Sequence, residues 1–187
     1  MEAFSDGVFA IAITLLVLEI SVPLDQFDHL WHAIGQQWPS YLAYATSFLT
    51  IGALWLAHHG IFRRMLAADH VMTRLNLVLL MAASFLPFPT KLMAESLHEH
   101  AGEHQSVLFY GGSLLVITTL LGAMARYAAR PALIADDVQR EHVRALGNRI
   151  NPNIGIYAFV ICAAAFFPRV AVFGYLYVAI VAVLRNR

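Results

Sequence analysis

The stretch Phe4-Ser-Asp-Gly-Val-Phe-Ala-Ile-Ala-Ile-Thr-Leu-Leu-Val-Leu-Glu-Ile20 decides the fold class of this chain. A serine and an aspartate, Ser5 and Asp6, lead directly into an apolar run of the length that crosses a membrane. An ionisable side chain this close to a membrane segment is costly and indicates a role. The run lacks the basic segment and the cleavage site of a signal peptide, so we expect a retained transmembrane helix over Phe4–Val22, ending at Pro23.

The composition of the whole chain agrees with this first helix. Of its 187 residues, 59% are hydrophobic and 13% are charged, whereas soluble domains carry about a quarter charged residues. The formal net charge is zero, so the composition gives no reason to expect a nucleic-acid partner. The single cysteine, Cys162, cannot form an internal disulfide and is expected to be a small packing residue. We therefore predict an all-α integral membrane protein.

Five further apolar segments have the length of about 17–25 residues, or slightly less, that a spanning helix needs. They lie near Pro39–Ile61, Met72–Ala94, Val107–Tyr127, Asn151–Phe167 and Ala171–Leu184. We expect the third span to be broken at Leu86-Pro-Phe-Pro-Thr90, and the last two to form a tight hairpin around Pro168-Arg169. No repeat or soluble domain is evident, so residues 1–187 are predicted to form one domain of six transmembrane helices.

The segment 128–148 is too polar to span a membrane. Its apolar residues alternate with arginines such as Arg140 and Arg144. This pattern fits an amphipathic linker helix at the cytoplasmic membrane surface, and an ordinary cytoplasmic helix is the alternative.

The distribution of basic residues predicts the orientation, because cytoplasmic loops collect lysine and arginine. The side opposite the termini holds Lys91 and Arg169. The other ten of the 12 lysines and arginines lie on the side of the termini: Arg63, Arg64, Arg74, Arg126, Arg130, Arg140, Arg144, Arg149, Arg185 and Arg187. We therefore expect both termini in the cytoplasm.

Helix geometry divides the first span into two faces. At about 100° per residue, six residues fall on one narrow stripe that points away from Ser5 and Asp6. These residues are Gly7, Ile11, Thr14, Leu15, Leu18 and Val22. From geometry alone, the stripe is interpreted as packing against lipid or other helices; the alternative is a hydrophobic constriction in a ring of identical subunits, which gates by dewetting.

The polar flank of the same helix needs partners, because an unpaired buried carboxylate would protonate or destabilise the fold. We predict that Asp6 is held by a donor at the same depth, with the indole N–H of Trp55 nearby. The candidate donors are His58, His59, Arg74 and Asn76. A structural clamp is the first interpretation, and a gating or proton-sensing role of the histidines is the alternative.

The string from Phe4 to Glu19 closely resembles the first helix of the transmembrane-protein-175 family, in a bacterial single-repeat form. The agreement extends to Trp55-x-x-His58-His59, to Asn76 and to the Pro-Phe-Pro stretch that starts at Pro87. The arginine that opens the family's Arg-x-x-x-Phe-Ser-Asp motif would fall one residue before Met1. We therefore expect either a truncated chain or a natural start further upstream.

The resemblance implies a potassium-permeable leak channel, a homotetramer in the bacterial inner membrane whose pore is lined by the first helix. It assigns the narrowest ring to Ile11, further pore-facing positions to Leu15 and Leu18, and a hydroxyl on the pathway to Thr14. It also implies that the triplet Phe4, Ser5 and Asp6 packs between helices with histidine and asparagine partners. The implied partners are potassium ions, the lipid bilayer and copies of the same chain.

The position of the polar groups distinguishes the channel from two competing functions. A proton-coupled transporter would use Asp6 with His58 and His59 as a relay, but transporters favour polar sites at the membrane midplane, and here the midplane of the first span is aliphatic. An intramembrane enzyme would need catalytic groups that converge, and none is evident, so no enzyme, cofactor or resident metal is expected. The segment from His98 to His104 has metal-ligating residue types and is expected to be a solvated loop.

Overall fold

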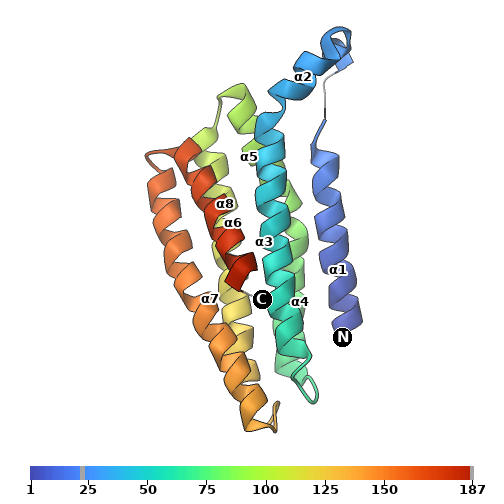
Figure 1. The fold of residues 1–187 in the computed structure, drawn as a ribbon, viewed down its shortest axis with the longest axis vertical. Coiled ribbons are helices and arrows are strands. Elements are labelled where there is room, and N and C mark those ends of the chain that lie inside the picture. The colour runs from blue at the N-terminus through green and yellow to red at the C-terminus, as the bar shows by residue number, and fades with distance from the viewer. Residues whose placement is uncertain (22–23, 186–187) are drawn as a thin grey trace.

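The computed structural model describes residues 1–21 and 24–185, which form an elongated bundle of helices (Figure 1). Its elements are α1 (Glu2–Leu15), the 3-10 helices η1 (Leu16–Glu19) and η2 (Leu24–His29), α2 (Leu30–Gln36), α3 (Trp38–Phe62), α4 (His70–Phe85), α5 (Pro87–Glu99), α6 (Glu103–Ala128), α7 (Asp137–Ala164) and α8 (Pro168–Arg185). The predicted end of the first span at Val22 and Pro23 lies outside the described residues. The all-α prediction is confirmed for the described part of the chain.

Within the described residues, four helical segments are long and apolar enough to cross a membrane. They are Trp38–Phe62, His70–Glu99, Glu103–Ala128 and Pro168–Arg185. These segments contain four of the six predicted spans. The two remaining predicted spans correspond to α1, which has only 14 residues, and to the second half of α7, whose first half is rich in charged side chains.

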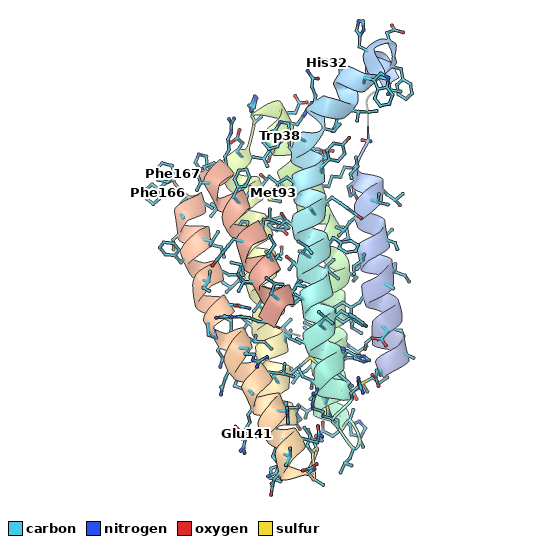
Figure 2. All side chains as sticks on the ribbon, viewed as in Figure 1. His32, Trp38, Met93, Glu141, Phe166 and Phe167 are labelled. Atoms are coloured by element: carbon cyan, nitrogen blue, oxygen red, sulfur yellow. The ribbon has the colours of Figure 1, made fainter. Side chains whose placement is uncertain are left out.

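The connections between helices alternate between the two ends of the bundle. Figure 1 shows the N-terminus at the same end as the α3–α4 and α6–α7 connections. The opposite end holds α2 and the α7–α8 turn, where Phe166 and Phe167 project outward in Figure 2. The predicted hairpin around Pro168 is present, since only residues 165–167 separate α7 from α8.

The predicted break in the third span is smaller than expected. Only Leu86 separates α4 from α5, and its backbone angles are still those of a right-handed helix, φ −58° and ψ −32°. Pro87 and Pro89 lie in the first turn of α5, where the N–H that proline lacks would have no acceptor within α5 itself. The two prolines therefore begin α5 directly after α4, and the span continues without a loop.

The linker predicted for 128–148 is not a separate helix. Residue 128 ends α6, and α7 starts at Asp137, where the Asp136 side chain accepts the Val138 N–H at 2.9 Å. From there α7 continues past Pro152 to Ala164. The helix packs against α6 on both sides of the proline: before it, Ile150 lies close to Gly122, and after it, Ile154 lies close to the same glycine.

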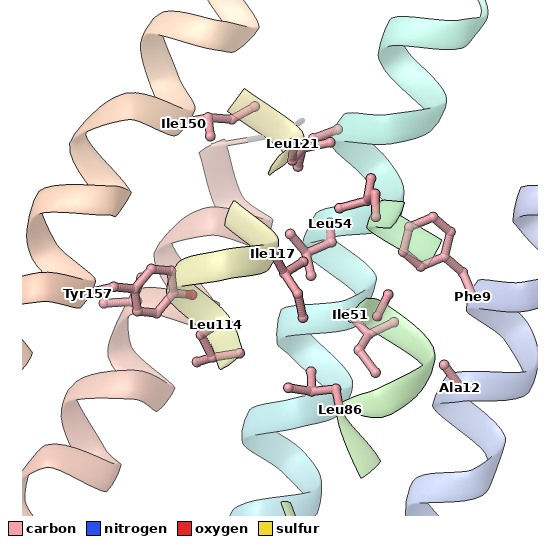
Figure 3. Close-up of a cluster of buried hydrophobic side chains, with 14 of the residues drawn as sticks. Phe9, Ala12, Ile51, Leu54, Leu86, Leu114, Ile117, Leu121, Ile150 and Tyr157 are labelled. Carbon is pink, nitrogen blue, oxygen red and sulfur yellow. The ribbon is translucent and has the colours of Figure 1, made fainter. Parts of the chain in front are cut away.

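The hydrophobic core joins the N-terminal helix to the rest of the bundle. Phe9 and Ala12 of α1 point toward Ile51 and Leu54 of α3 and toward Leu86 (Figure 3). Cys162 was predicted to be a small packing residue, but in the structure it is exposed on α7 and lies outside this core. A buried polar bridge complements the apolar contacts.

That bridge is centred on Ser47 of α3. Its hydroxyl lies 2.8 Å from Thr90 Oγ1 of α5 and 2.9 Å from Tyr110 Oη of α6. All three side chains are buried. In a membrane, hydroxyl pairs of this kind hold helices together and fix their register.

The two faces of the N-terminal helix

Helix α1 presents one face to its own protomer and one face outward. Its buried side chains follow helical spacing and are Ser5, Phe9, Ala12 and, in η1, Leu16. The outward stripe is aliphatic: the exposed fraction is 60% for Ile11, 40% for Leu15 and 71% for Leu18. Thr14 lies on the same face, and its hydroxyl donates to the carbonyl of Ile11 at 2.9 Å. The stripe deduced from helix geometry is therefore the exposed face of α1 in the protomer.

A buried hydrogen-bond chain fixes the inward face near the N-terminus. Asn76 Nδ2 of α4 donates to Ser5 Oγ at 3.0 Å, and Asn76 Oδ1 lies 2.7 Å from His58 Nε2 of α3. Because an amide oxygen only accepts, the histidine must carry its hydrogen on Nε2. The ring of His58 stacks on Phe62 with centroids 4.5 Å apart and meets the edge of Phe9. This chain ties α1, α3 and α4 together in the interior.

A second polar cluster lies beside this chain and is only half-buried. Trp55 Nε1 donates to Asp6 Oδ1 at 2.8 Å. His59 Nδ1 lies 4.0 Å from the same carboxylate oxygen and 3.0 Å from Glu2 Oε1. The contact with Glu2 has the distance of an ion pair without the geometry of a hydrogen bond.

The predicted partners of Asp6 are thus divided between two residues. Trp55 donates its indole N–H, as predicted, and His59 lies within ion-pair distance. His58 and Asn76 are close by but bond through Ser5 instead, because the serine faces the interior and Asp6 lies one position further around the helix. Arg74 is exposed and forms no contact with Asp6 in the described part of the chain.

Two details of the site differ from the sequence interpretation. Phe4 does not pack between helices: its side chain is 60% exposed in the protomer. Glu2 was not predicted as a site residue, although its spacing of four positions from Asp6 places both carboxylates on one helical face. That spacing was the signal that could have identified it.

The far end of α1 is attached by a charged contact. Glu19 Oε2 at the end of η1 lies 3.3 Å from Lys91 Nζ of α5. The helix is therefore held at both ends, by the Ser5 and Asp6 contacts at one and by this ion pair at the other.

Together, the apolar helices and the two-faced α1 define a multi-pass helical membrane protein. Residues 1–87 match the profile of a family described as the endosomal/lysosomal potassium channel TMEM175. A potassium channel of Streptomyces collinus is 48% identical over 126 residues, which cover 67% of this chain and 60% of that protein. A potassium channel of Chamaesiphon minutus is 42% identical over 168 residues, which cover 86% of this chain and 82% of that protein.

A solved structure agrees with the same assignment. The crystal structure of a lysosomal potassium-selective channel TMEM175 homologue from Chamaesiphon minutus superposes with a TM-score of 0.89 at 36% identity, covering 100% of this chain and 96% of that one. The chain belongs to the TMEM175 family, which is a family of ion channels and not of enzymes.

Proposed function

We propose that this chain is one subunit of a homotetrameric, potassium-permeable leak channel of a bacterial inner membrane, with α1 lining the central pore. The observation that carries this proposal is the division of α1. Its polar residues Ser5 and Asp6 are satisfied within the protomer, whereas its aliphatic stripe is left outward. Around a symmetry axis shared by identical subunits, the stripe of each subunit would face the same stripe of the other subunits.

The proposed pathway has a hydrophobic constriction at Ile11. A ring of aliphatic side chains offers no oxygen ligands to a dehydrating ion, so ions pass partly hydrated and selectivity is modest. Leu15 and Leu18 continue the apolar lining toward the other end of α1, and Thr14 supplies the hydroxyl nearest to the constriction. Protons, which can follow transient water in such a pore, are included as permeant ions.

Six spans per subunit are part of the proposal. Helix α1 has 14 residues and η1 has 4. At the usual rise per residue of an α-helix and a 3-10 helix, the two together are about 29 Å long. This length is close to the hydrocarbon thickness of about 30 Å. The fifth span is supplied by the second half of α7, because residues 150–168 carry no charged side chain. The basic residues gathered at the end of the bundle that holds the N-terminus support cytoplasmic termini.

Potassium flux in liposomes tests the constriction. Ile11→Asn introduces a polar group into the ring, so wetting becomes easier, and we expect potassium flux to rise several-fold with a shift of the reversal potential under a potassium–sodium gradient. The matched control is Ile156→Asn, on the exposed face of α7 at the opposite edge of the bundle (Figure 1). Unchanged conductance and selectivity in Ile11→Asn would exclude the constriction.

A proton-coupled transporter with Asp6, His58 and His59 as the relay is the competing function. One observation favours it: His59 lies near the Asp6 carboxylate in a half-buried cluster. A carrier gives saturable, proton-coupled flux that Asp6→Asn abolishes, whereas a channel gives flux that stays linear with potassium concentration over a wide range. The same liposomes, measured with and without a proton gradient, distinguish the two.

A further inference from the structure

We propose that Glu2, Asp6 and His59 form a binding site for a divalent transition-metal ion, with Zn²⁺ as the best-fitting ion. The three side chains each offer one ligand atom, and these atoms all lie within 4.8 Å of one another. They come from two helices that are far apart in the sequence. The site would fasten the start of α1 to the end of α3.

The backbone arrangement brings these groups together through two matching pairs. Glu2 and Asp6 are four residues apart on α1, and Trp55 and His59 are four residues apart on α3, so each pair lies on one face of its helix. The two faces oppose each other, as the 2.8 Å bond from Trp55 to Asp6 shows. A metal ion placed among them needs no rearrangement of either helix.

The distances suit a small metal ion. Zinc binds imidazole nitrogen and carboxylate oxygen at about 2.0–2.2 Å, so ligand atoms around a tetrahedral ion are about 3.4 Å apart. Here His59 Nδ1 is 3.0 Å from Glu2 Oε1 and 4.0 Å from Asp6 Oδ1. Small rotations of side chains that are about one third exposed bring all three atoms to that separation, and water completes the coordination.

The donor set decides which ion is preferred. An imidazole ligand suits zinc, cobalt and nickel, whereas calcium and magnesium are bound mainly by oxygen. Two carboxylates beside one imidazole supply negative charge, which attracts a divalent cation.

Two features of the surroundings point to a ligand at this place. His59 Nδ1 is buried and has no hydrogen-bond partner, although it faces two carboxylates. Trp55 donates its indole N–H to Asp6 Oδ1, which fixes the orientation of that carboxylate, and its ring lies against the His59 ring with centroids 5.4 Å apart. Metal ligands are usually oriented by such outer contacts.

Zinc binding to the whole chain in detergent is the direct test. Titration calorimetry measures the binding of Zn²⁺, and the d–d absorption of Co²⁺, used in place of zinc, reports the ligands. We expect about one ion per chain, with affinity lowered at least 10-fold in Glu2→Gln and in His59→Gln. Two controls keep all three ligands. They are His142→Gln on α7 and the double variant His98→Gln/His104→Gln, whose histidines lie in the last turn of α5 and the first turn of α6 rather than in the loop expected from the sequence. If Glu2→Gln binds zinc with the same affinity as the unsubstituted protein, the proposed site is wrong.

Thermal unfolding separates loss of the site from loss of the fold. Zinc is expected to raise the midpoint of the unsubstituted protein and of the control variants, because an ion that binds only the folded state stabilises it. The midpoint of Glu2→Gln should not respond, and Ca²⁺ or Mg²⁺ should have no effect on any of them. The absence of zinc binding would indicate a simple histidine–carboxylate contact, and calcium binding as tight as that of zinc would indicate a site without the imidazole ligand. Either result overturns the proposal.

An effect of zinc on ion flux rests on the proposed function, because it requires α1 to line the pore. Zinc on the N-terminal side should then slow potassium flux in the unsubstituted protein more than in Glu2→Gln. Failure of the two proposals is distinguishable: absent zinc binding in detergent contradicts the metal site, whereas intact zinc binding without any potassium flux contradicts the channel.

Discussion

Asn76 and Ser5 are joined by a hydrogen bond of 3.0 Å from Asn76 Nδ2 to Ser5 Oγ, and both side chains are almost fully buried. The partners are 71 positions apart in the sequence. Through this bond the serine that precedes Asp6, rather than Asp6 itself, anchors α1 in the interior.

Replacing Asn76 by leucine should destabilise the protein. The substitution leaves the Nε2–H of His58 buried without an acceptor, which costs about 1–3 kcal/mol. We expect a lower midpoint of thermal unfolding in detergent. Asn148→Leu, at an exposed position of α7, is the matched control and should leave the midpoint nearly unchanged. Equal midpoints for the two variants would show that the buried chain adds no stability.

The contact between Trp55 and Asp6 should be measurable as a coupling. Trp55→Phe and Asp6→Asn each remove or weaken the 2.8 Å bond, and each is expected to lower the free energy of unfolding by about 1 kcal/mol. If the bond is the shared cause, the double variant loses less than the two single losses combined. Strict additivity would mean that the two side chains act independently.

Two adjacent glycines of α6 should respond in opposite directions to alanine. A Cβ atom at Gly111 would lie 2.1 Å from the hydroxyl oxygen of Tyr175, a buried residue of α8, whereas a Cβ at Gly112 has no neighbour within 4 Å. Gly111→Ala should therefore cost about 1–3 kcal/mol through overpacking. Gly112→Ala should gain about 0.5–1 kcal/mol from helix propensity. Unfolding midpoints of the two variants provide the comparison.

Stability should fall at acid pH through Asp69. This carboxylate caps α4 by accepting the Met72 N–H at 2.8 Å, and it also accepts the Tyr127 hydroxyl at 2.5 Å. These bonds, the backbone one first, hold the pKa of Asp69 below its ordinary value of 3.8. A carboxylate whose pKa is lower in the folded state than in the unfolded state contributes its full stability at pH values above the unfolded-state pKa. That contribution is lost as the pH falls through the lower, folded-state pKa.

Unfolding midpoints measured between pH 6 and about pH 2 test this dependence. The decline should be shallower in Asp69→Asn, which can still cap the helix but does not titrate. Tyr127→Phe is expected to lie between the two, since it keeps the backbone bond alone. Identical pH profiles for all three proteins would contradict the assignment to Asp69.

Thiol accessibility should distinguish the two faces of α1. In a Cys162→Ser background, a cationic thiol reagent should react with Thr14→Cys and lower potassium flux, because Thr14 lies on the outward stripe. Ala12→Cys, two positions earlier and almost fully buried, should be unreactive. Reaction at position 14 without any effect on flux would place the stripe away from the pathway.

The sequence was informative where one local signal decides the outcome. Hydrophobic length predicted the apolar spans of α3, α4–α5, α6 and α8, and the period of 3.6 residues separated Ile11 and Leu15 from Ser5. The acidic flank also required a donor at its depth, which identified Trp55. Each of these follows from the cost of leaving polar groups in lipid.

The sequence was less informative where packing between helices overrides a local signal. The fifth span was expected to begin at Asn151, but α7 starts at Asp137 and runs through Pro152, because Ile150 and Ile154 on either side of that proline pack against Gly122 of α6. Pro87 and Pro89 predicted a break, but both lie in the first turn of α5, where proline is tolerated. The choice between Ser5 and Asp6 as the interior anchor depends on about 100° of helix rotation relative to α3 and α4. No signal within one helix specifies that rotation.

The division of α1 into two faces has a consequence for variation at the N-terminus. In a saturation mutagenesis of residues 4–18, tolerance should repeat along the chain in two interleaved patterns. Changes at Ser5, Phe9, Ala12 and Leu16 would deplete the protein from the membrane, because they remove its internal support. Changes at Ile11, Thr14, Leu15 and Leu18 would leave abundance intact and alter only what the assembled protein does, so a measurement of expression alone would score half of the helix as free to vary.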